Sequence, residues 1–373
     1  MRRRYRKHET TSRTEKVVRT LAIFLAVGAF LMVSAYGFAI WFVDPPTVNR
    51  PTEAPERIKT DEPGAIDQGD YGNMEPEAVL VPQSQEDRTY TFLITGEDDG
   101  FGGPDVIMVV VFDATAKTLN VLSIPRDTMV NVPWGLRKIN SIQHMHRYLP
   151  QQYDHYIYAM TEHVEKLVGF PIDHWVTVDL PGFVTLIDAL PGGGVAFDVP
   201  QRMLYHDPHQ DLMIDLQPGL QHLDGRQAMY LVRFRSYVEG DIRRVQVQHE
   251  FLAALSDQLL QARNILMVDD LVRVFRDNVD TSLTVRNLAY LALEFLQVES
   301  ENIHFHSVDE TLANIFDHIN GISYVSLYVE PWLELINEHL NPLPWDIRAE
   351  DLEILTRDLN TGALFTTNGA PFY

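Results

Sequence analysis

Charged residues of the kinds that bind phosphate occur in separate segments of the chain. Arg126 and Asp127 follow the apolar run 119–124 after a single proline, and an arginine cluster occurs much further along. That cluster consists of Arg233, Arg235 and Arg244. Arginine guanidinium groups bind phosphate through paired hydrogen bonds, and carboxylates hold hard cations such as Mg²⁺. Together these residue types indicate a site for a phosphoryl group.

Two aspartates flank a glycine-rich segment, 96–105, that is expected to link two strands. Its glycines allow the backbone to turn tightly and to approach a ligand closely. Asp98 and Asp105 can therefore share one Mg²⁺ or Mn²⁺ and leave coordination positions for water and phosphate oxygens. The alternative interpretation is a solvated acidic hairpin, because aspartate and glycine are common in turns.

The residues around Arg126 suggest a ligand site at the edge of a sheet. Pro125 ends the preceding strand, so Arg126 emerges at the edge where α/β proteins bind ligands. Lys138 and Asn140 follow soon after and add a cation and an amide. The alternative is a surface ion pair between Arg126 and Asp127, which contributes only about 0–1 kcal/mol.

The arginine cluster has a spacing that places its members on shared faces. In an extended segment, Arg233 and Arg235 point to the same side. On a helix, Arg244 and Gln248 lie on one face because they are four residues apart. Arg243 is a further candidate for substrate binding, although its position favours contact with solvent or with acidic residues. Each arginine taken singly is also compatible with an ordinary surface cation.

The hydrophobic pattern predicts the elements that position these residues. Continuous or alternating apolar runs predict strands, and apolar residues at helical spacing predict helices. The strands are expected at 90–95, 106–112, 119–124 and 174–180, and the main helices at 156–169 and 241–262. Interleaved strands and helices indicate an α/β (α+β) fold, with a central mixed β-sheet covered by helices on both faces. We expect the main domain, which carries the predicted phosphoryl-group site, to span 89–265, with 266–330 as its helical continuation and 331–373 as an extension of ambiguous pattern.

The N-terminal part predicts a membrane anchor. Residues 1–20 form a basic arm, and residues 21–43 contain no charge. As a helix the second segment spans roughly 34 Å, enough to cross the ~30 Å hydrocarbon core. A cleaved signal peptide is the alternative, but its apolar region is shorter, about 7–15 residues. The basic arm favours a cytoplasmic N terminus and an extracytoplasmic C-terminal domain, joined by an acidic, proline-rich stalk at 44–88.

Composition narrows the classes of partner. The 373 residues carry a net charge of −22, while residues 1–19 hold eight basic and two acidic residues. The body of the chain is therefore strongly acidic, and nucleic acid is not an expected partner. The chain has no cysteine, which excludes disulfides, thiolate metal sites and a thiol nucleophile.

The ordered set of motifs resembles the LytR-CpsA-Psr family of bacterial envelope enzymes over roughly Tyr90–Ala262. Gly96, Asp98 and Asp105 match its opening pattern, and Ser123-Ile-Pro-Arg-Asp127 matches its second motif in full. The remaining matches are Lys138 and Asn140, Asp173–Asp179, Gly182–Asp188, Pro218–Gly219, Leu223–Gly225, Ala228, Arg233 and Arg235, and Asp241, Arg244 and Gln248. The resemblance therefore covers each of the segments that carry the predicted phosphoryl-group site.

Three positions depart from the family pattern. Gly100 stands in place of an arginine, Pro104 in place of a serine and Val247 in place of another arginine. Two phosphate contacts are therefore either lost or supplied by other residues, for example Arg137 or Arg243.

The resemblance implies a membrane-anchored extracytoplasmic transferase. Such an enzyme moves a glycopolymer from a polyprenyl-pyrophosphate carrier to peptidoglycan by forming a phosphodiester. Asp98 and Asp105 would hold Mg²⁺, while Arg126, Asp127, Arg233, Arg235, Arg244 and Gln248 would act on the pyrophosphate. Apolar walls made by the sheet and the helices at 156–169 and 241–262 would hold the prenyl chain. The alternatives are a polyprenyl-pyrophosphate phosphatase or phosphodiesterase, and a non-catalytic protein that binds polyprenyl phosphate.

Overall fold

The computed structural model describes residues 43–48, 50–51, 88–97, 103–132, 135–145, 153, 155–207, 212–238, 240–262, 265–358 and 360–371. By its contacts the chain divides into two units, and every described helix and strand belongs to the second, Pro46–Tyr373. The predicted basic arm, the apolar span at 21–43 except for its last residue, and most of the stalk lie outside the described residues. None of the helices that the structure describes is both long enough and apolar enough to span a membrane.

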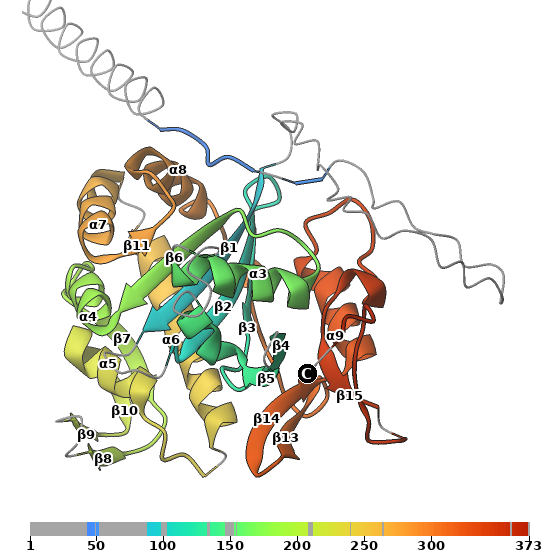
Figure 1. Cartoon of the computed structure of the whole chain (residues 1–373). Helices are drawn as coiled ribbons and strands as arrows, with labels where there is room; N and C mark the ends of the chain where they lie inside the picture. The colour runs from blue at the N-terminus through green and yellow to red at the C-terminus, as the bar shows by residue number, and fades with distance from the viewer. Residues whose placement is uncertain are drawn as a thin grey trace, which may run out of the picture. The chain divides into compact units, whose positions relative to one another are not determined.

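A mixed six-stranded sheet forms the centre of the second unit, as the sequence predicts (Figure 1). Its strands run in the order β11-β6-β1-β2-β3-β12, with β1–β2–β3 antiparallel and the pairs β1–β6 and β3–β12 parallel. The bounds are β1 Thr89–Glu97, β2 Val106–Asp113, β3 Thr118–Ser123, β6 His174–Asp179, β11 Asp280–Thr281 and β12 Ile303–Ser307. The loop of acidic residues and the Arg126 segment both leave this sheet at the same end, because β1 and β2 are joined there and β3 ends beside them.

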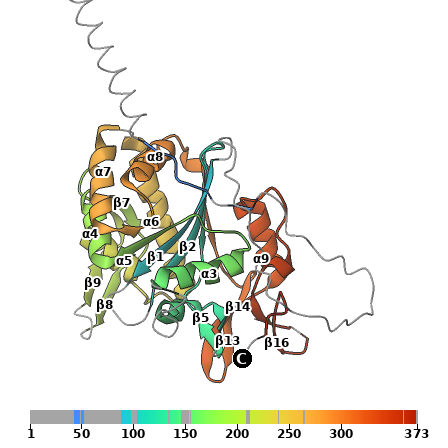
Figure 2. The same cartoon turned by 45° about the horizontal axis from the view of Figure 1, so that its top comes forward.

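Both faces of the sheet are covered, because side chains alternate along each strand. Ile107 and Val109 of β2 pack on one face against α3 (Tyr156–Val168) and α9 (Val329–Leu335). Met108 and Val110 pack on the other face, against α6 (Asp241–Ala262), α7 (Ile265–Asn278) and α8 (Val285–Phe295). Figure 2 shows the resulting layers, with α6–α8 on one side of the strands and α3 and α9 on the other.

A separate apolar core lies beside this sheet. Strands β7 (Val195–Val199) and β10 (Gly219–Leu223) pair, as do β8 (Met203–Asp207) and β9 (Leu212–Leu216). Together with α4 (Leu180–Asp188) and α5 (Gly225–Arg233) they pack against one face of α6. Asp224 caps α5 by accepting a hydrogen bond from the Gln227 backbone N–H. This cap fixes where α5 begins, and the helix then ends at Arg233, one of the predicted site residues.

The C-terminal third is less helical than the sequence suggests. Residues 266–330 do contain α7 and α8, but they also supply β12 and the hairpin of β13 (Ala313–Ile319) and β14 (Ile322–Leu327). In β12 only Ile303 and Phe305 face the core, a period-two pattern over five residues that helical spacing does not reveal. Residues beyond 331 belong to the same unit, since the Trp332 indole N–H, fully buried, donates to the Leu167 carbonyl at 2.7 Å. The remaining elements are β4 Met129–Val132, β5 Gly135–Lys138, η1 Ile139–His144, η2 Ser300–Asn302, η3 Ile336–Leu340, η4 Ala349–Asp351, β15 Leu355–Arg357 and β16 Leu364–Thr366.

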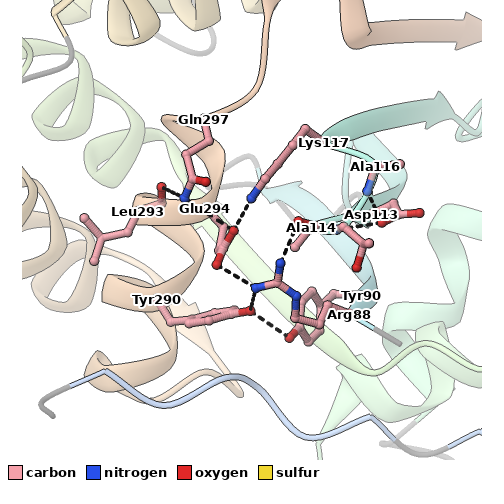
Figure 3. A network of polar contacts seen from close by, with 11 residues as sticks. Arg88, Tyr90, Asp113, Ala114, Ala116, Lys117, Tyr290, Leu293, Glu294 and Gln297 are labelled. Carbon is pink, nitrogen blue, oxygen red and sulfur yellow. Dashed lines mark hydrogen bonds and ion pairs between the residues drawn. The ribbon is translucent and has the colours of Figure 1, made fainter. Parts of the chain in front are cut away.

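Ion pairs fix the segments that precede β1 to the body of the second unit. Arg50 is buried and donates to Asp173 at 2.9 Å and to the Thr89 carbonyl at 2.7 Å. Nearby, Arg88 donates to Glu294 of α8 at 2.9 Å and to the Tyr290 hydroxyl at 3.3 Å, as Figure 3 shows. Lys117 pairs with the same Glu294 carboxylate. The residue that precedes β1 is therefore bonded to a helix more than two hundred positions later, since Arg88 and Glu294 are 206 positions apart.

Candidate functional site

An apolar cavity of about 270 Å³ lies between the central sheet and helices α4, α5 and α6. Its wall is mainly aliphatic and aromatic. The lining includes Ile94, Val106, Met108, Val178, Phe183, Leu186, Phe251, Leu252 and Leu255. A lining of this kind excludes polar groups that need hydrogen bonds and accepts a hydrocarbon chain.

Charged groups gather at one end of this cavity. Its lining includes the charged Asp105, Arg233, Arg235 and Arg244 and the neutral Gln248, although Asp105 directly precedes β2 and the others lie in α5, after α5 and in α6. The Asp105 carboxylate pairs with Arg235 through one oxygen and with Arg126 through the other. Arg244 is only 4% exposed. The arginines predicted from separate segments therefore converge on one place.

A second cavity of about 250 Å³, here called the cleft, adjoins the first. Asp105, Arg244 and Gln248 line both, so these side chains form the border between an apolar space and a more polar one. The cleft is lined further by Ser123, Arg126, Asp127, Gly240, Ile242 and residues of the hairpin β13–β14. This border can hold the charged group of an amphiphile whose apolar chain fills the first cavity.

Local backbone contacts explain why Arg126 and Asp105 meet. The Asp105 backbone N–H donates to the Gly96 carbonyl at 3.1 Å, which closes the loop between β1 and β2. Gly103 has a left-handed φ of +80°, and a Cβ there would lie 2.1 Å from the Asn140 carbonyl oxygen. Only glycine permits this close approach of the loop to the segment after β5. The Asn140 N–H in turn donates to the Arg126 carbonyl at 3.2 Å.

Lys138 and Asn140 support the site and do not line the cavities. Lys138 Nζ lies 3.1 Å from Asp127 Oδ1, and Arg126 Nε lies 3.9 Å from the same atom. Asp127 is therefore held between two cations. Asn140 acts through its backbone, as described above, and neither residue is among those that line the two cavities.

Helix α6 presents different faces to the site and to the core. The Gln248 side-chain amide donates to the Val232 carbonyl at 3.0 Å, so α6 holds the end of α5 that carries Arg233. Val247 is fully buried in the second core and points away from both cavities. The hypothesis that Arg137 or Arg243 replaces a lost phosphate contact finds no support here. Arg137 donates to the Leu136 carbonyl, Arg243 pairs with Glu250 at 2.7 Å, and neither lines either cavity.

One predicted wall of the apolar cavity is wrong. The sequence assigned it to the helices at 156–169 and 241–262, but only the second of these, α6, contributes. Helix α3 packs on the opposite face of the sheet, where Ile157 and Met160 contact the main core. Helical spacing shows that a helix has a buried face, but it does not show which face of the sheet the helix covers.

The predicted Mg²⁺ site has few acidic side chains to bind the ion. Asp98 lies outside the described residues, and Asp105 is the acidic residue that the structure brings to the border of the cavities. Among the described residues there is no group of three or more acidic or histidine side chains able to hold a metal by itself. A carboxylate has about four lone-pair sites, so Asp105 can bind a cation beside its two arginines. The chemistry fits Mg²⁺, which is commonly held by one or two carboxylates together with phosphate oxygens.

A buried serine–histidine contact lies next to the site and was not predicted. Ser123 Oγ and His249 Nε2 are 2.7 Å apart, and Ser123 lines the cleft. Burial lowers the pKa of His249 to about 4, so the ring is neutral near pH 7. No residue spacing signals this pair, because its two members come from β3 and α6 and meet only in the folded protein.

The low pKa of His249 predicts a specific loss of stability in acid. In the unfolded chain the His249 ring takes up a proton near pH 6.5, whereas in the folded protein it does so only near pH 4. The stabilisation is therefore complete above pH 6.5 and is lost as pH falls from about 6.5 to about 4, by at most about 3 kcal/mol. Unfolding in urea across this range, with His249→Gln as the comparison, measures the effect. Profiles of equal steepness in the two proteins would contradict the assignment.

Comparisons with known proteins identify the family. A model of the LytR-CpsA-Psr family matches residues 58–339. The chain is 28% identical over 343 residues to the polyisoprenyl-teichoic acid–peptidoglycan teichoic acid transferase TagV of Bacillus subtilis (strain 168), covering 88% of this chain and 80% of TagV. It is 37% identical over 174 residues to the probable cell wall biosynthesis protein LcpB of Corynebacterium glutamicum, covering 46% of this chain and 38% of LcpB.

A solved structure agrees with the sequence comparisons. The crystal structure of B. subtilis TagV covers 68% of this chain and 97% of its own, with a TM-score of 0.55 and 28% identity. The resemblance inferred from the motifs is thereby confirmed, and the matched region extends well beyond Ala262. The chain belongs to the LytR-CpsA-Psr family.

Proposed function

We propose that this protein is a transferase that moves a glycopolymer from a polyprenyl-pyrophosphate carrier to peptidoglycan. The observation that carries the proposal is the border of Asp105, Arg244 and Gln248 between an apolar cavity and the cleft. A polyprenyl pyrophosphate matches this arrangement, because its hydrocarbon chain suits the apolar cavity and its charged pyrophosphate suits the border. The relative TagV, named for transfer of teichoic acid to peptidoglycan, supports the same class of reaction.

The reaction follows from where the charges lie. An acceptor hydroxyl oxygen forms a bond to the phosphorus that carries the glycopolymer, and the bond from that phosphorus to the bridging oxygen breaks. Lipid phosphate leaves with the bonding electrons, and the hydroxyl proton passes to solvent in the cleft. Arg126, Arg233, Arg235 and Arg244 stabilise the negative charge that builds up on the leaving phosphate. Because Asp105 fixes two of these guanidinium groups in advance, little reorganisation is needed.

A bound Mg²⁺ or Mn²⁺ is part of the proposal. Asp105 would contribute to its site together with Asp98 and the substrate's phosphate oxygens. When bound, the ion would neutralise charge on those oxygens. Asp127 is proposed to orient Arg126, since both Arg126 and Lys138 lie within 4 Å of its carboxylate, at 3.9 Å and 3.1 Å.

We propose that the protein works outside the cytoplasm on a membrane anchor. The uncharged span at 21–43, preceded by basic residues, supports this location. A carrier lipid stays in the membrane, so an anchored domain meets it at a high local concentration.

Transfer can be tested with the full-length protein in liposomes. The donor probe is a polyprenyl-pyrophosphate-linked disaccharide with a labelled sugar, and the acceptor is uncross-linked peptidoglycan glycan strands, with and without Mg²⁺. We expect label linked to the glycan through a phosphodiester, one lipid phosphate released per link, and loss of both products when Mg²⁺ is chelated.

Two other outcomes of this assay would indicate a different function. Label released as free sugar phosphate, with none on the glycan, would indicate a phosphatase or phosphodiesterase that uses water as acceptor. Saturable binding of the donor without any product would indicate a non-catalytic lipid-binding protein.

A further inference from the structure

The hairpin β13–β14 forms one wall of the cleft. The cleft is lined by Ile315, Phe316, Ser323 and Val325 of this hairpin, together with residues of α6 and the Arg126 segment. The Val325 backbone N–H donates to the Asp127 carbonyl at 2.9 Å, and Val325 also forms a parallel bridge with Thr128. The hairpin is therefore attached directly to the segment that carries the phosphate-site residues, and its position relative to them is fixed.

A β-bulge changes the direction of the hairpin's side chains at this wall. The register between β13 and β14 shifts between Asn314 and Asp317, which leaves Ile315 and Phe316 outside the regular pairing. The Asn314 side chain accepts a hydrogen bond from the Phe316 N–H at 3.2 Å, and the His318 ring lies 2.9 Å from the Phe316 carbonyl. Bulges near active sites commonly redirect one side chain. Here the redirected side chain is Phe316, which is 68% exposed and still lines the cleft.

The bulge is held firmly from behind. Asp317 is buried and accepts hydrogen bonds from the Ser326 hydroxyl at 2.6 Å and from Arg357 at 3.1 and 3.2 Å. Burial opposes ionisation, but the bonds from Arg357 and Ser326 keep the pKa of Asp317 below its usual value. This charged, hydrogen-bonded residue next to Phe316 fixes the backbone that carries the exposed ring.

We propose that Phe316 is the platform on which a pyranose ring of the acceptor glycan lies during transfer. This inference rests on the proposed function. An in-line displacement requires the acceptor hydroxyl to approach phosphorus from the side opposite the leaving lipid phosphate. Since the lipid chain occupies the apolar cavity, the acceptor must approach through the cleft, on the other side of Asp105 and Arg244.

A phenyl ring suits this ligand. One face of a pyranose presents C–H groups with partial positive charge, and the face of an aromatic ring carries partial negative charge. The nearby arginines bind the phosphate, so a rigid apolar ring on the opposite wall can orient the sugar without adding charge. Phe316 is thus a residue that determines how the acceptor binds, in addition to the groups that bind the donor.

The test compares Phe316→Ala with Phe316→Tyr in full-length protein. The donor and the peptidoglycan glycan strands are those of the transfer assay. Loss of the ring is expected to raise the acceptor KM about three- to tenfold, while kcat and the donor KM change less than about twofold. Tyrosine keeps the ring and should restore the acceptor KM. Ile322→Ala is the matched control, because Ile322 lies on the same hairpin and is 49% exposed but does not line the cleft.

Three outcomes would overturn the inference. An unchanged acceptor KM in Phe316→Ala would show that the ring does not contact the acceptor. A raised donor KM with an unchanged acceptor KM would assign the ring to a sugar of the donor. If wild-type protein forms no linked product, the proposed function itself fails, and the acceptor platform fails with it.

Discussion

Replacement of Arg244 by alanine is expected to lower kcat/KM for transfer about ten- to a hundredfold. Arg244 is 4% exposed and lies where the apolar cavity meets the cleft. A charged hydrogen bond to pyrophosphate in such a place contributes about 1.5–3 kcal/mol. Lysine should restore little activity, because it lacks the planar fork that binds two oxygens together.

The same loss is expected for Arg126, Arg233 and Arg235. Their effects should not add, since all of them act on one ligand and two of them share Asp105. Steady-state kinetics and donor binding, measured with thermal stability, separate loss of the site from loss of the fold. Arg276→Ala is a suitable control, because Arg276 is an exposed residue of α7 that pairs with the neighbouring Asp277. Normal donor binding in all four alanine variants would refute the site.

The second large effect is expected at the buried pair of Arg50 and Asp173. Both side chains are fully inaccessible, and the Asp173 carboxylate also accepts from the Thr91 N–H at 2.9 Å and the Thr91 hydroxyl at 2.8 Å. Asp173→Asn leaves the Arg50 charge buried without its counter-ion. We expect this change to lower the free energy of unfolding by about 3–5 kcal/mol, measured in urea.

Two further variants make that result specific. Arg50→Met combined with Asp173→Asn removes both charges, so it should be more stable than Asp173→Asn alone. Asp215→Ala breaks the exposed pair with Arg202, in which the N–O distance is 3.4 Å, and should cost no more than about 1 kcal/mol. A small loss in Asp173→Asn, comparable to that in Asp215→Ala, would mean that water reaches the Arg50 guanidinium in the folded protein.

Most of the central sheet could be predicted because its strands are apolar on both faces. The run 106–112 has no helical period, and in the structure it forms β2 between two helical layers. The arginines could be predicted as a set because each lies at an element end or on the polar face of a helix. The sequence prediction placed all of them in one phosphate-binding pocket but did not identify Asp105 as their partner. The structure supplies the ion pairs by which Asp105 holds Arg126 and Arg235.

Other parts depend on contacts that a local pattern does not encode. Strand β12 pairs in parallel with β3, and parallel pairing leaves no turn signal between the partners. The face of the sheet that α3 covers also depends on how the chain connects α3 to the strands, which the spacing of its apolar residues does not show. The position of the β13–β14 hairpin at the cleft was not predicted, because the hydrogen bond from Val325 to Asp127 joins residues far apart in the sequence. His249 was overlooked because a buried histidine beside Gln248 has no distinguishing spacing.

The position of β12 at the edge of the sheet sets the order in which the protein can be completed. Residues 303–307 must be synthesised before β3 can pair with its second neighbouring strand, and residues 313–327 must be synthesised before the hairpin can line the cleft. Pairings between such distant segments form slowly, because a long loop must close before any contact rewards it. A chain that emerges N-terminal end first therefore contains all of its clustered arginines before it contains the hairpin β13–β14 that walls the cleft. Until residues 303–307 pair with it, β3 has one edge without a neighbouring strand, and such an edge can pair with another chain.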